Sequence, residues 1–316
     1  MKPSQPNCFL GVEIGGTKTQ LVVTDESLIP VEKYAYEVGK SKEASQIRQL
    51  LSEKIPGLIS SHPIQSVGIG FGGPVNPATG CIHQSFHVSG WDDFNLQQWM
   101  IDLTDLPVFV DNDCNVAALS EAVHGAGQPY SRVFYITLGS GVGGGFVVNG
   151  NIYYGKGPSE LEVGHLVLNK KGATLESSCS GWAVNGKLID YIKRAPKSKL
   201  AKLVVETKEE ETKCMLTAMK AGDHGVAEIW NSTMDDLALG LSHVIHLLNP
   251  DVIVVGGGLS LIGNDLVEDT KKKLPKYLMS TLKNKLPKVR LSELKEMSVP
   301  YGAILLARSK LLMLNQ

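Results

Sequence analysis

Clusters of glycine at the ends of apolar runs constrain the fold of this chain more than any other feature. The 316 residues include 33 glycines, and many of them directly follow short runs of β-branched residues. The three clearest turns are Gly15-Gly16-Thr17-Lys18, Gly139-Ser140-Gly141-Val142-Gly143 and Gly256-Gly257-Gly258. Glycine lets the backbone turn tightly and approach a ligand, and successive N–H groups in such turns form concave anion sites. One turn alone would indicate a simple hairpin, but three in one chain predict a cradle for nucleotide phosphates.

The two common phosphate-binding fingerprints do not describe these turns. The chain contains no GxxxxGK[ST] loop. The spacing GxGxxG occurs at Gly139, Gly141 and Gly144, but residues 144–148 continue as a strand where that fingerprint requires a helix. The hydroxyls of Thr17 and Ser140 and the charge of Lys18 would add to a cradle of another kind.

The order of the expected elements predicts an α/β fold made of two related lobes. A strand, a glycine turn and a returning strand occur twice, at residues 8–23 and 132–148, which indicates a weak internal repeat. The length suits two lobes of about 150 residues each. We expect an N-terminal lobe over 1–116 and a C-terminal lobe over 117–300, with a helical excursion at about 180–225. The last helix, 301–316, is expected to pack back on the first lobe.

Expected strands cover 8–14, 21–23, 31–38, 66–71, 107–110, 132–138, 144–148 and 251–255, and expected helices cover 42–59, 112–123, 180–193, 197–220, 227–248 and 303–314. Strands that alternate with helices are typical of an α/β protein.

Composition excludes several other classes of protein. The 31 basic and 32 acidic residues give a net charge of −1, whereas a nucleic-acid-binding chain would have a basic face. Apolar residues make up 43% and no apolar run approaches the ~20 residues of a membrane span. The five cysteines are scattered without a CxxC pair, and the N-terminus is a poor signal peptide. We therefore expect a reduced, cytoplasmic protein that binds neither nucleic acid nor membrane.

Two polar clusters are candidates for chemistry. Asp111-Asn112-Asp113-Cys114-Asn115 lies where a strand passes into a helix, a common place for both helix caps and substrate sites. Asp113 could accept a hydroxyl proton, and Asn112 could orient that hydroxyl. In the second cluster, Glu162 and His165 could bind a polyol, although a lone histidine is as often an ordinary packed residue. Glu176 cannot be assigned from spacing.

Taken in order, these motifs resemble those of the ROK family of sugar kinases, within the sugar kinase/actin/Hsp70 superfamily. The matching segments are 11–18 and 138–145 (phosphate loops), 70–75 (sugar-side loop), 111–121 (catalytic segment), 162–165 and 175–176 (sugar-binding segments) and 249–259 (adenosine strand and loop). They span about residues 9–263.

The resemblance implies two actin-like, RNase H-like lobes with ATP and a hexose between them, and a homodimer. It implies that Asp113 is the catalytic base. The sugar-binding residues that it implies are Gly72, Gly73, Asn112, Asp113, Glu162, His165 and Glu176. The ATP-binding residues are Gly15, Gly16, Thr17, Lys18, Gly139, Ser140, Gly141, Gly143, Gly256, Gly257 and Gly258.

The chain departs from the family pattern in two places, and both concern metals. The first phosphate loop usually begins with Asp but begins here with Glu13, so we expect Mg²⁺ near Glu13 or Asp111. Many relatives carry a CxCGxxGC zinc segment after the histidine, whereas residues 166–174 contain no cysteine here. We expect no structural zinc, unless distant residues such as Cys214 or His224 supply ligands.

The sequence therefore predicts a MgATP-dependent hexose kinase, with glucose phosphorylated at its 6-hydroxyl. A fructokinase or an N-acetylhexosamine kinase of the same family is the alternative. Trp91 and residues 85–90 lie where specificity varies in the family, but Trp91 is equally compatible with a core or rim aromatic. A sugar-responsive repressor is disfavoured because the first strand begins by Cys8, which leaves no room for a DNA-binding segment before it. A non-catalytic sugar-binding regulator is disfavoured because Asp113 and both phosphate loops are present.

Overall fold

Contacts divide the chain into two compact units, which we describe separately. The computed structural model describes residues 7–39, 43–85, 88–157 and 159–314. The first unit comprises Met1–Ser131, Gly145–Glu160 and Leu294–Gln316, and the second comprises Arg132–Gly144 and Leu161–Glu293. We expected a boundary at 116/117, but the division keeps helix α3 (Asp113–His124) whole in the first unit. The reason is packing, because α3 lies against the last helix, α11 (Ser298–Leu314), and against strand β4.

The first unit is built around one five-stranded sheet with the order β3-β2-β1-β4-β7. Strand β1 pairs antiparallel with β2 and parallel with β4, and β4 pairs parallel with β7. The bounds of these strands are β1 Cys8–Ile14, β2 Lys18–Thr24, β3 Pro30–Glu37, β4 Ile64–Phe71 and β7 Val108–Asn112, and a two-stranded ribbon joins β5 Val75–Asn76 to β6 Cys81–Ile82. Because β1, β4 and β7 are parallel, their carboxyl ends all lie at the same end of the sheet.

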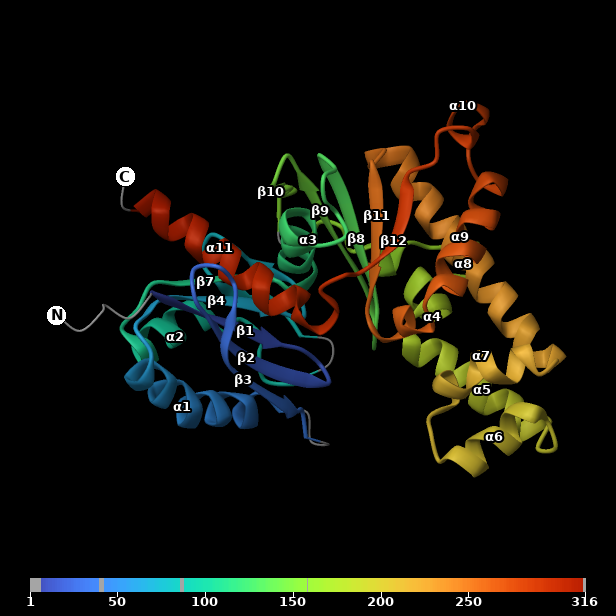
Figure 1. Cartoon of the computed structure of the whole chain (residues 1–316), viewed down its shortest axis with the longest axis horizontal. Helices are drawn as coiled ribbons and strands as arrows, with labels where there is room; N and C mark the ends of the chain where they lie inside the picture. The colour runs from blue at the N-terminus through green and yellow to red at the C-terminus, as the bar shows by residue number, and fades with distance from the viewer. Residues whose placement is uncertain (1–6, 40–42, 86–87, 158, 315–316) are drawn as a thin grey trace. The chain divides into compact units, whose positions relative to one another are not determined.

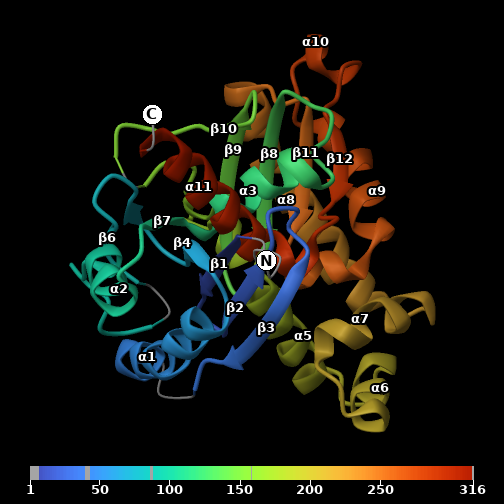
Figure 2. The ribbon, with the colours of Figure 1, turned by 60° about the vertical axis from the view of Figure 1, so that its left-hand side comes forward.

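Helices cover both faces of this sheet, as its uniformly buried central strands require. In Figure 1, α1 (Ala44–Ser61) and α2 (Leu96–Thr104) lie on one face, and α3 and α11 lie on the other. Side chains of β1 alternate accordingly: Leu10 and Val12 join the core beneath α1, whereas Phe9 packs with Ile304 of α11. Figure 2 shows the same sheet from another side, with α11 crossing it. Glu13 has the same parity as Phe9 and therefore lies on the α11 face.

The C-terminal helix α11 is a core element of the first unit. Residues Lys295–Leu314 are the one segment of the described chain that is long and apolar enough to pass as a membrane span, although the sequence suggested no such run. Its buried side packs against β1, β4 and α3, so packing inside the unit accounts for its apolar character. Glu121 of α3, fully buried, accepts hydrogen bonds from Leu294 N (3.0 Å) and Ser298 Oγ (2.9 Å) and so fixes the start of this helix.

The second five-stranded sheet has the order β10-β9-β8-β11-β12. The second unit holds β8 Arg132–Leu138, β11 Val252–Gly256, β12 Lys288–Leu291 and the start of β9 Val142–Val148, whereas the rest of β9 and β10 Asn151–Ile152 belong to the first unit. The helices of the second unit are α4 Leu175–Cys179, α5 Gly181–Arg194, α6 Lys199–Thr207, α7 Glu211–Lys220, α8 His224–Leu248, α9 Asn264–Lys273 and α10 Ser280–Lys283. If the strands of each sheet are numbered by their order in the chain, both sheets have the spatial order 3-2-1-4-5. The first and fourth strands are parallel in both, as β4 is to β1 and β11 is to β8. The repeated strand–turn–strand pattern in the sequence therefore corresponds to a repeated sheet topology.

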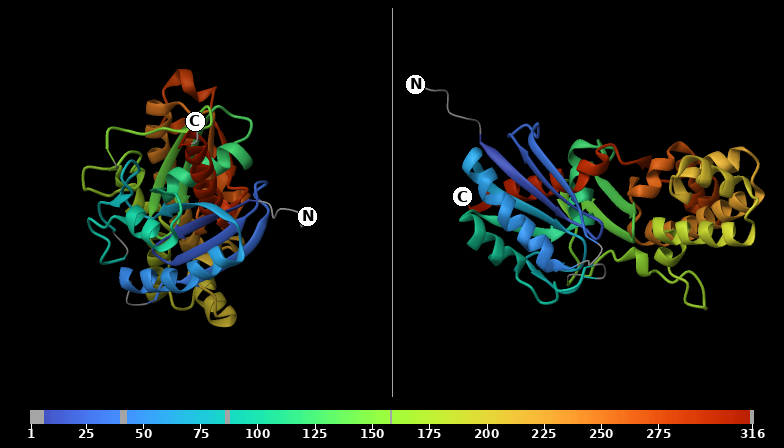
Figure 3. Two further views of the ribbon diagram at one scale, coloured as in Figure 1. Left: turned by 90° about the vertical axis from the view of Figure 1, so that its left-hand side faces the viewer. Right: turned by 90° about the horizontal axis from the view of Figure 1, so that it is seen from below.

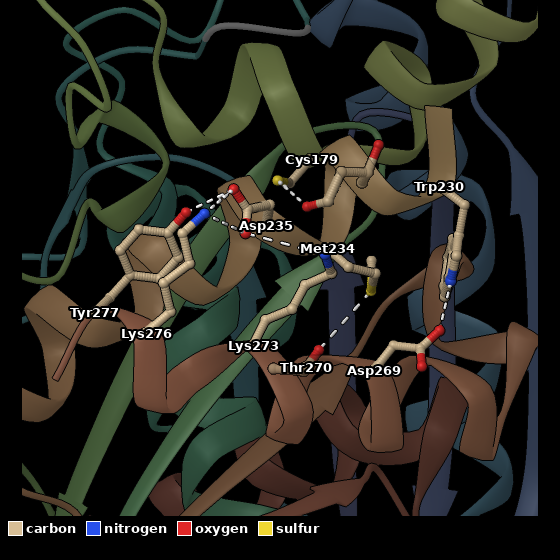
Figure 4. A network of polar contacts seen from close by, with 10 residues as sticks. Cys179, Trp230, Met234, Asp235, Asp269, Thr270, Lys273, Lys276 and Tyr277 are labelled. Atoms are coloured by element: carbon tan, nitrogen blue, oxygen red, sulfur yellow. Dashed lines mark hydrogen bonds and ion pairs between the residues drawn. The ribbon is translucent and has the colours of Figure 1, made fainter. Parts of the chain in front are cut away.

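Helices α5, α6 and α7 pack together in the second unit, and α5 and α7 also contact α8; they are the yellow-green to yellow helices in Figure 3. The charged stretch 197–220, expected as one helical stretch, is two helices because Lys208 ends α6 in a left-handed conformation (φ 58°). A polar network then joins the long helix α8 to the segment that follows it (Figure 4). Trp230 Nε1 donates to Asp269 Oδ2 of α9 at 2.8 Å, and the hydroxyl of Tyr277 donates to Asp235 at 2.6 Å.

We predict that Gly68→Ala strongly destabilises the protein. A Cβ at position 68 of β4 would lie 1.9 Å from the carbonyl oxygen of Ala303 in α11, so the helix would have to move off the sheet. Overpacking of a core typically costs about 1–3 kcal/mol in the free energy of unfolding, and a clash with backbone belongs at or beyond the upper end. Urea denaturation of the variant measures this loss.

Gly57→Ala is the matched control. Gly57 is exposed inside α1, and a Cβ there would have no neighbour within 4 Å. Alanine is favoured over glycine in a helix interior by about 0.5–1 kcal/mol, so this variant should be as stable as the parent or more so. Equal stability of the Gly68 variant and the parent would contradict the close packing of β4 on α11.

Candidate active site

The first glycine turn joins β1 to β2, and its neighbour Glu13 is a buried, paired carboxylate. Glu13 Oε2 accepts a hydrogen bond from Gln20 Nε2 at 2.5 Å and lies 3.4 Å from Lys18 Nζ. Burial raises the pKa of this carboxyl, and the Lys18 ammonium opposes that rise. Gln20 Nε2 also donates to the carbonyl oxygen of Glu296, which ties the carboxylate to the start of α11. Lys18 therefore lies beside the turn and forms an ion pair with Glu13.

Asn112 and Asp113 lie at the turn from β7 into α3, as the sequence predicts. Asn112 caps the helix, because its Oδ1 accepts hydrogen bonds from Cys114 N (2.8 Å) and Asn115 N (3.3 Å). Its Nδ2 donates to the carbonyl oxygen of Gly73 at 3.1 Å. Asp113 Oδ1 accepts from Cys114 N at 2.8 Å. An acidic side chain in the first turn of a helix is favoured by the helix dipole.

The loop after β4 brings Gly72 and Gly73 to the same place. A Cβ at Gly72 would lie 3.4 Å from Asp113 Oδ2, so this oxygen faces the glycine at ordinary contact distance. Gly72 N also donates to the carbonyl oxygen of Ile14, the last residue of β1, at 2.8 Å. The predicted residues of the first unit therefore converge from the carboxyl ends of β1, β4 and β7, which are neighbours in the sheet.

Asp111 is a fully engaged structural carboxylate. It is 1% exposed, and burial raises its pKa. Oδ1 accepts from Asn112 N (2.7 Å) and Asn115 Nδ2 (3.0 Å), and Oδ2 accepts from the hydroxyl of Tyr154 (2.6 Å). These three donors leave little capacity for a metal, so Asp111 is a poorer candidate for Mg²⁺ than Glu13. Within the described part of the chain, Glu13 Oε1 accepts no hydrogen bond and points towards Gly15.

In the second unit, the second glycine turn connects β8 to β9 and is held by backbone and side-chain bonds. Gly139 N donates to Gly141 O at 3.0 Å, and Gly181 N at the start of α5 donates to Gly139 O at 2.7 Å. Glu176 Oε2 accepts from Val142 N at 2.9 Å. Spacing in the sequence left the role of Glu176 open, and the family resemblance implied sugar binding; in the structure its carboxylate contacts this turn.

Glu162 directly precedes a short 3₁₀ turn, Val163–His165, of which His165 is the last residue, and the turn lies beside Glu176. His165 N donates to Glu162 O at 3.1 Å, and Leu175 N donates to Leu166 O at 2.9 Å, which joins this turn to α4. A Cβ at Gly164 would come within 3.4 Å of Glu176 Cβ. The three predicted polyol-binding residues of this unit are therefore brought together with the second glycine turn.

The third glycine turn follows β11, the neighbour of β8. Gly257 has a positive φ of 81°, and a Cβ there would lie 2.6 Å from backbone atoms of Leu138. A position with both a left-handed backbone and such close contact admits only glycine without strain. Because Leu138 directly precedes Gly139, the second and third glycine turns adjoin each other.

Sequence reasoning missed several residues around these groups. Tyr154 and Gln20 each make a polar contact to a candidate carboxylate, yet each stands outside any recognisable motif. Asn115 belongs to the polar cluster at 111–115, but the sequence indicated no role for it, and the structure shows that it donates to Asp111. Trp91 proves to be a core residue, fully buried with its ring edge-on to Phe71 at 5.5 Å, and it offers no surface to a ligand.

Comparison with known proteins agrees with this arrangement. The model of the ROK family matches residues 9–310. A glucokinase of Halalkalibacterium halodurans is 29% identical over 285 residues, which cover 86% of each chain. An N-acetyl-D-glucosamine kinase of Yersinia enterocolitica is 29% identical over 278 residues, covering 86% of this chain and 90% of that protein. The crystal structure of a ROK family glucokinase from Streptomyces griseus in complex with glucose and AMPPNP superposes with a TM-score of 0.84 at 25% identity, covering 96% of this chain and 99% of that one.

The protein is thus a sugar kinase with the actin-like α/β fold. It belongs to the ROK family, because the family model matches nearly the whole chain.

The thiols of Cys179 and Cys214, which could be considered as zinc ligands together with His165, are both buried and engaged in other contacts. Among the described residues, no three His, Cys, Asp or Glu side chains are grouped so as to hold a metal ion. Cys179, the nearest cysteine in sequence to His165, donates to Thr233 O (Figure 4), and burial raises the pKa of its thiol to about 12. A zinc ligand must be the thiolate, and burial disfavours that form at Cys179. Cys214 is buried against Thr207, with its sulfur 3.3 Å from Oγ1.

We predict that the protein purified without chelators contains far less than one zinc per chain. Structural zinc requires four ligands, usually closely spaced cysteines and histidines. Elemental analysis by mass spectrometry checks this, with activity measured before and after treatment with a zinc-selective chelator. Stoichiometric zinc, or loss of activity that added zinc restores, would show that distant residues complete a site.

Proposed function

We propose that this protein transfers the γ-phosphoryl group of ATP to a hexose, with glucose and its 6-hydroxyl as the preferred acceptor. The observation that carries the proposal is the placement of Asp113. Its carboxylate stands at the first turn of α3, with Oδ1 held by Cys114 N and Oδ2 facing Gly72. A carboxylate that is fixed at the first turn of a helix and lies beside a glycine loop is suited to receive a hydroxyl proton.

The proposed reaction needs one base and much positioning. The hexose hydroxyl oxygen attacks the γ-phosphorus, its proton passes to Asp113 Oδ2, and the bond from the γ-phosphorus to the leaving ADP oxygen breaks. Phosphoryl transfer relies on orientation and charge stabilisation more than on covalent chemistry by the protein. Asn112, whose amide is fixed by Gly73 O, would orient the hydroxyl. Glu162, His165 and Glu176 would bind the other sugar hydroxyls.

The glycine turns are proposed to hold the nucleotide. Backbone N–H groups and hydroxyls of Gly15, Gly16, Thr17, Gly139, Ser140, Gly141 and Gly143, with the Lys18 ammonium, would bind the phosphates. Gly256, Gly257 and Gly258 would lie along the adenosine. Mg²⁺ held beside the first glycine turn would neutralise part of the charge of the phosphates. Glu13 fits a contact to that ion through water, because Oε1 points towards the turn while Oε2 is held by Gln20.

The sugar could also be fructose or an N-acetylhexosamine. Glucokinases and an N-acetyl-D-glucosamine kinase are similar to this chain to the same degree. A coupled ADP-release screen with MgATP over hexoses and acetylhexosamines distinguishes these acceptors. It also tests a non-catalytic sugar-binding regulator, which would release no ADP with any of them. A cytoplasmic homodimer is part of the same proposal: the dimer is proposed from the family resemblance, and the compartment from the five scattered cysteines.

Asp113→Asn should lower turnover by about 10²–10⁴-fold while sugar affinity changes little. The amide keeps the shape and hydrogen bonding of the side chain but cannot accept the hydroxyl proton, and a general base is worth about that factor. Steady-state kinetics and sugar titration by calorimetry measure the two quantities. Asp92→Asn, on an exposed loop, is the matched control. Turnover within a few-fold of the parent would remove Asp113 from the base role.

The preferred hexose should raise the melting temperature, and a non-hydrolysable ATP analogue should raise it further. A ligand that binds only the folded state stabilises it by about 2.7 kcal/mol at a concentration one hundred times its Kd. Differential scanning fluorimetry over the sugar panel, at millimolar concentration, provides the measurement. An absence of any shift across the panel would count against a sugar substrate of this class.

A further inference from the structure

Two side chains of one loop bind the base of the turn that carries Asn112 and Asp113. The loop comes after β10, within the first unit, and the structure describes its residues 154–157, 159 and 160. At one end, the hydroxyl of Tyr154 donates to Asp111 Oδ2 at 2.6 Å. At the other end, Glu160 Oε1 accepts from Asn115 Nδ2 at 3.2 Å. Asn115 Nδ2 also reaches Asp111 Oδ1 at 3.0 Å, which joins the two attachments into one network.

Asp111 transmits this attachment to the backbone of the proposed catalytic turn. Its Oδ1 accepts from the N–H of Asn112 at 2.7 Å, directly before Asp113. Asp111 is 1% exposed and Asn115 is 3% exposed, so neither can replace a lost partner with bulk water. A buried carboxylate oxygen left without a donor is costly, and the backbone around it shifts to find one. The Tyr154 hydroxyl is the donor that the structure gives to Oδ2.

We propose, on the basis of the function proposed above, that Tyr154 is a positioning residue for phosphoryl transfer, which acts through Asp111 to hold Asn112 and Asp113 in register with the acceptor hydroxyl. The tyrosine does not contact the reacting atoms. Its loop continues directly to the segment of Glu162 and His165, so the same loop connects residues proposed for two parts of the sugar site. A displacement of about 1 Å in a catalytic group can lower the rate by about 10²-fold.

The experiment compares Tyr154→Phe with Tyr153→Phe. Tyr153 is the adjacent tyrosine, and within the described structure its side chain makes a ring contact with Phe146 and no hydrogen bond. Both variants lose one hydroxyl from the same loop, but only Tyr154 loses a bond to Asp111. We expect turnover of Tyr154→Phe to fall by about 10–100-fold, with KM for ATP within twofold of the parent, and we expect this loss to persist at temperatures well below the melting temperature of the variant. Tyr153→Phe should match the parent.

A second pair tests the other end of the loop. Glu160→Gln retains a side-chain oxygen that can accept from Asn115, whereas Glu160→Ala does not. We expect turnover to fall in the alanine variant and to be largely retained in the glutamine variant. This rescue distinguishes a hydrogen bond that positions the turn from the mere presence of a charge beside it.

Each outcome supports or overturns the positioning role. Turnover of Tyr154→Phe within twofold of the parent would overturn it. A loss of turnover that disappears when the assay is cooled well below the melting temperature of the variant would also overturn it. The tyrosine would then serve only the stability of the fold. If the parent itself releases no ADP with any sugar in the panel, the proposed function fails, and that result is visible before any variant is made.

Discussion

The junction of β7 and α3 is the point on which the candidate active site of this kinase depends. Three adjacent strands end there, and a helix begins there with its first N–H groups unpaired. Asn112 satisfies two of those groups and ties the junction to Gly73 of the neighbouring loop. The buried carboxylate of Asp111 accepts a hydrogen bond from the backbone N–H of Asn112. Asp113 can therefore be held rigidly at a surface turn, because the residues on both sides of it are fixed.

The same junction explains why the charges near the site are buried rather than exposed. Glu13 lies at the carboxyl end of the central strand β1 and Asp111 at that of the edge strand β7, and helices cover both faces of the sheet. Burial disfavours the ionised form and raises the pKa of both carboxyls. Each is balanced by a specific partner, Tyr154 for Asp111 and Lys18 for Glu13. Such paired and desolvated groups concentrate at functional sites, and the two carboxylates serve different purposes: one supports the turn, and the other stands beside a glycine loop.

Repetition of a single topology organises the rest of the molecule. Each sheet has the same strand order, and each begins with a hairpin whose turn is rich in glycine. The units differ in the helices added to this common sheet. The second unit adds helices α5, α6 and α7. In the first unit, the C-terminal helix α11 packs on the sheet. The helix pair α3 and α11 explains why the contact boundary falls after Ser131 and not at 116/117.

Local patterns in the sequence determined the elements, the repeat and most of the polar clusters. Strand 132–138 and the cap at Asn112 follow from β-branched runs and helix-start chemistry, which act over a few residues. Helix α2 and strand β12 escaped prediction, because tertiary packing stabilises these short segments more than their own periodicity. Only the tertiary structure showed that Trp91 is core, that Glu176 holds the second glycine turn, and that Tyr154 binds Asp111 across 43 residues of chain. Such contacts depend on which strands become neighbours, and no local pattern encodes that.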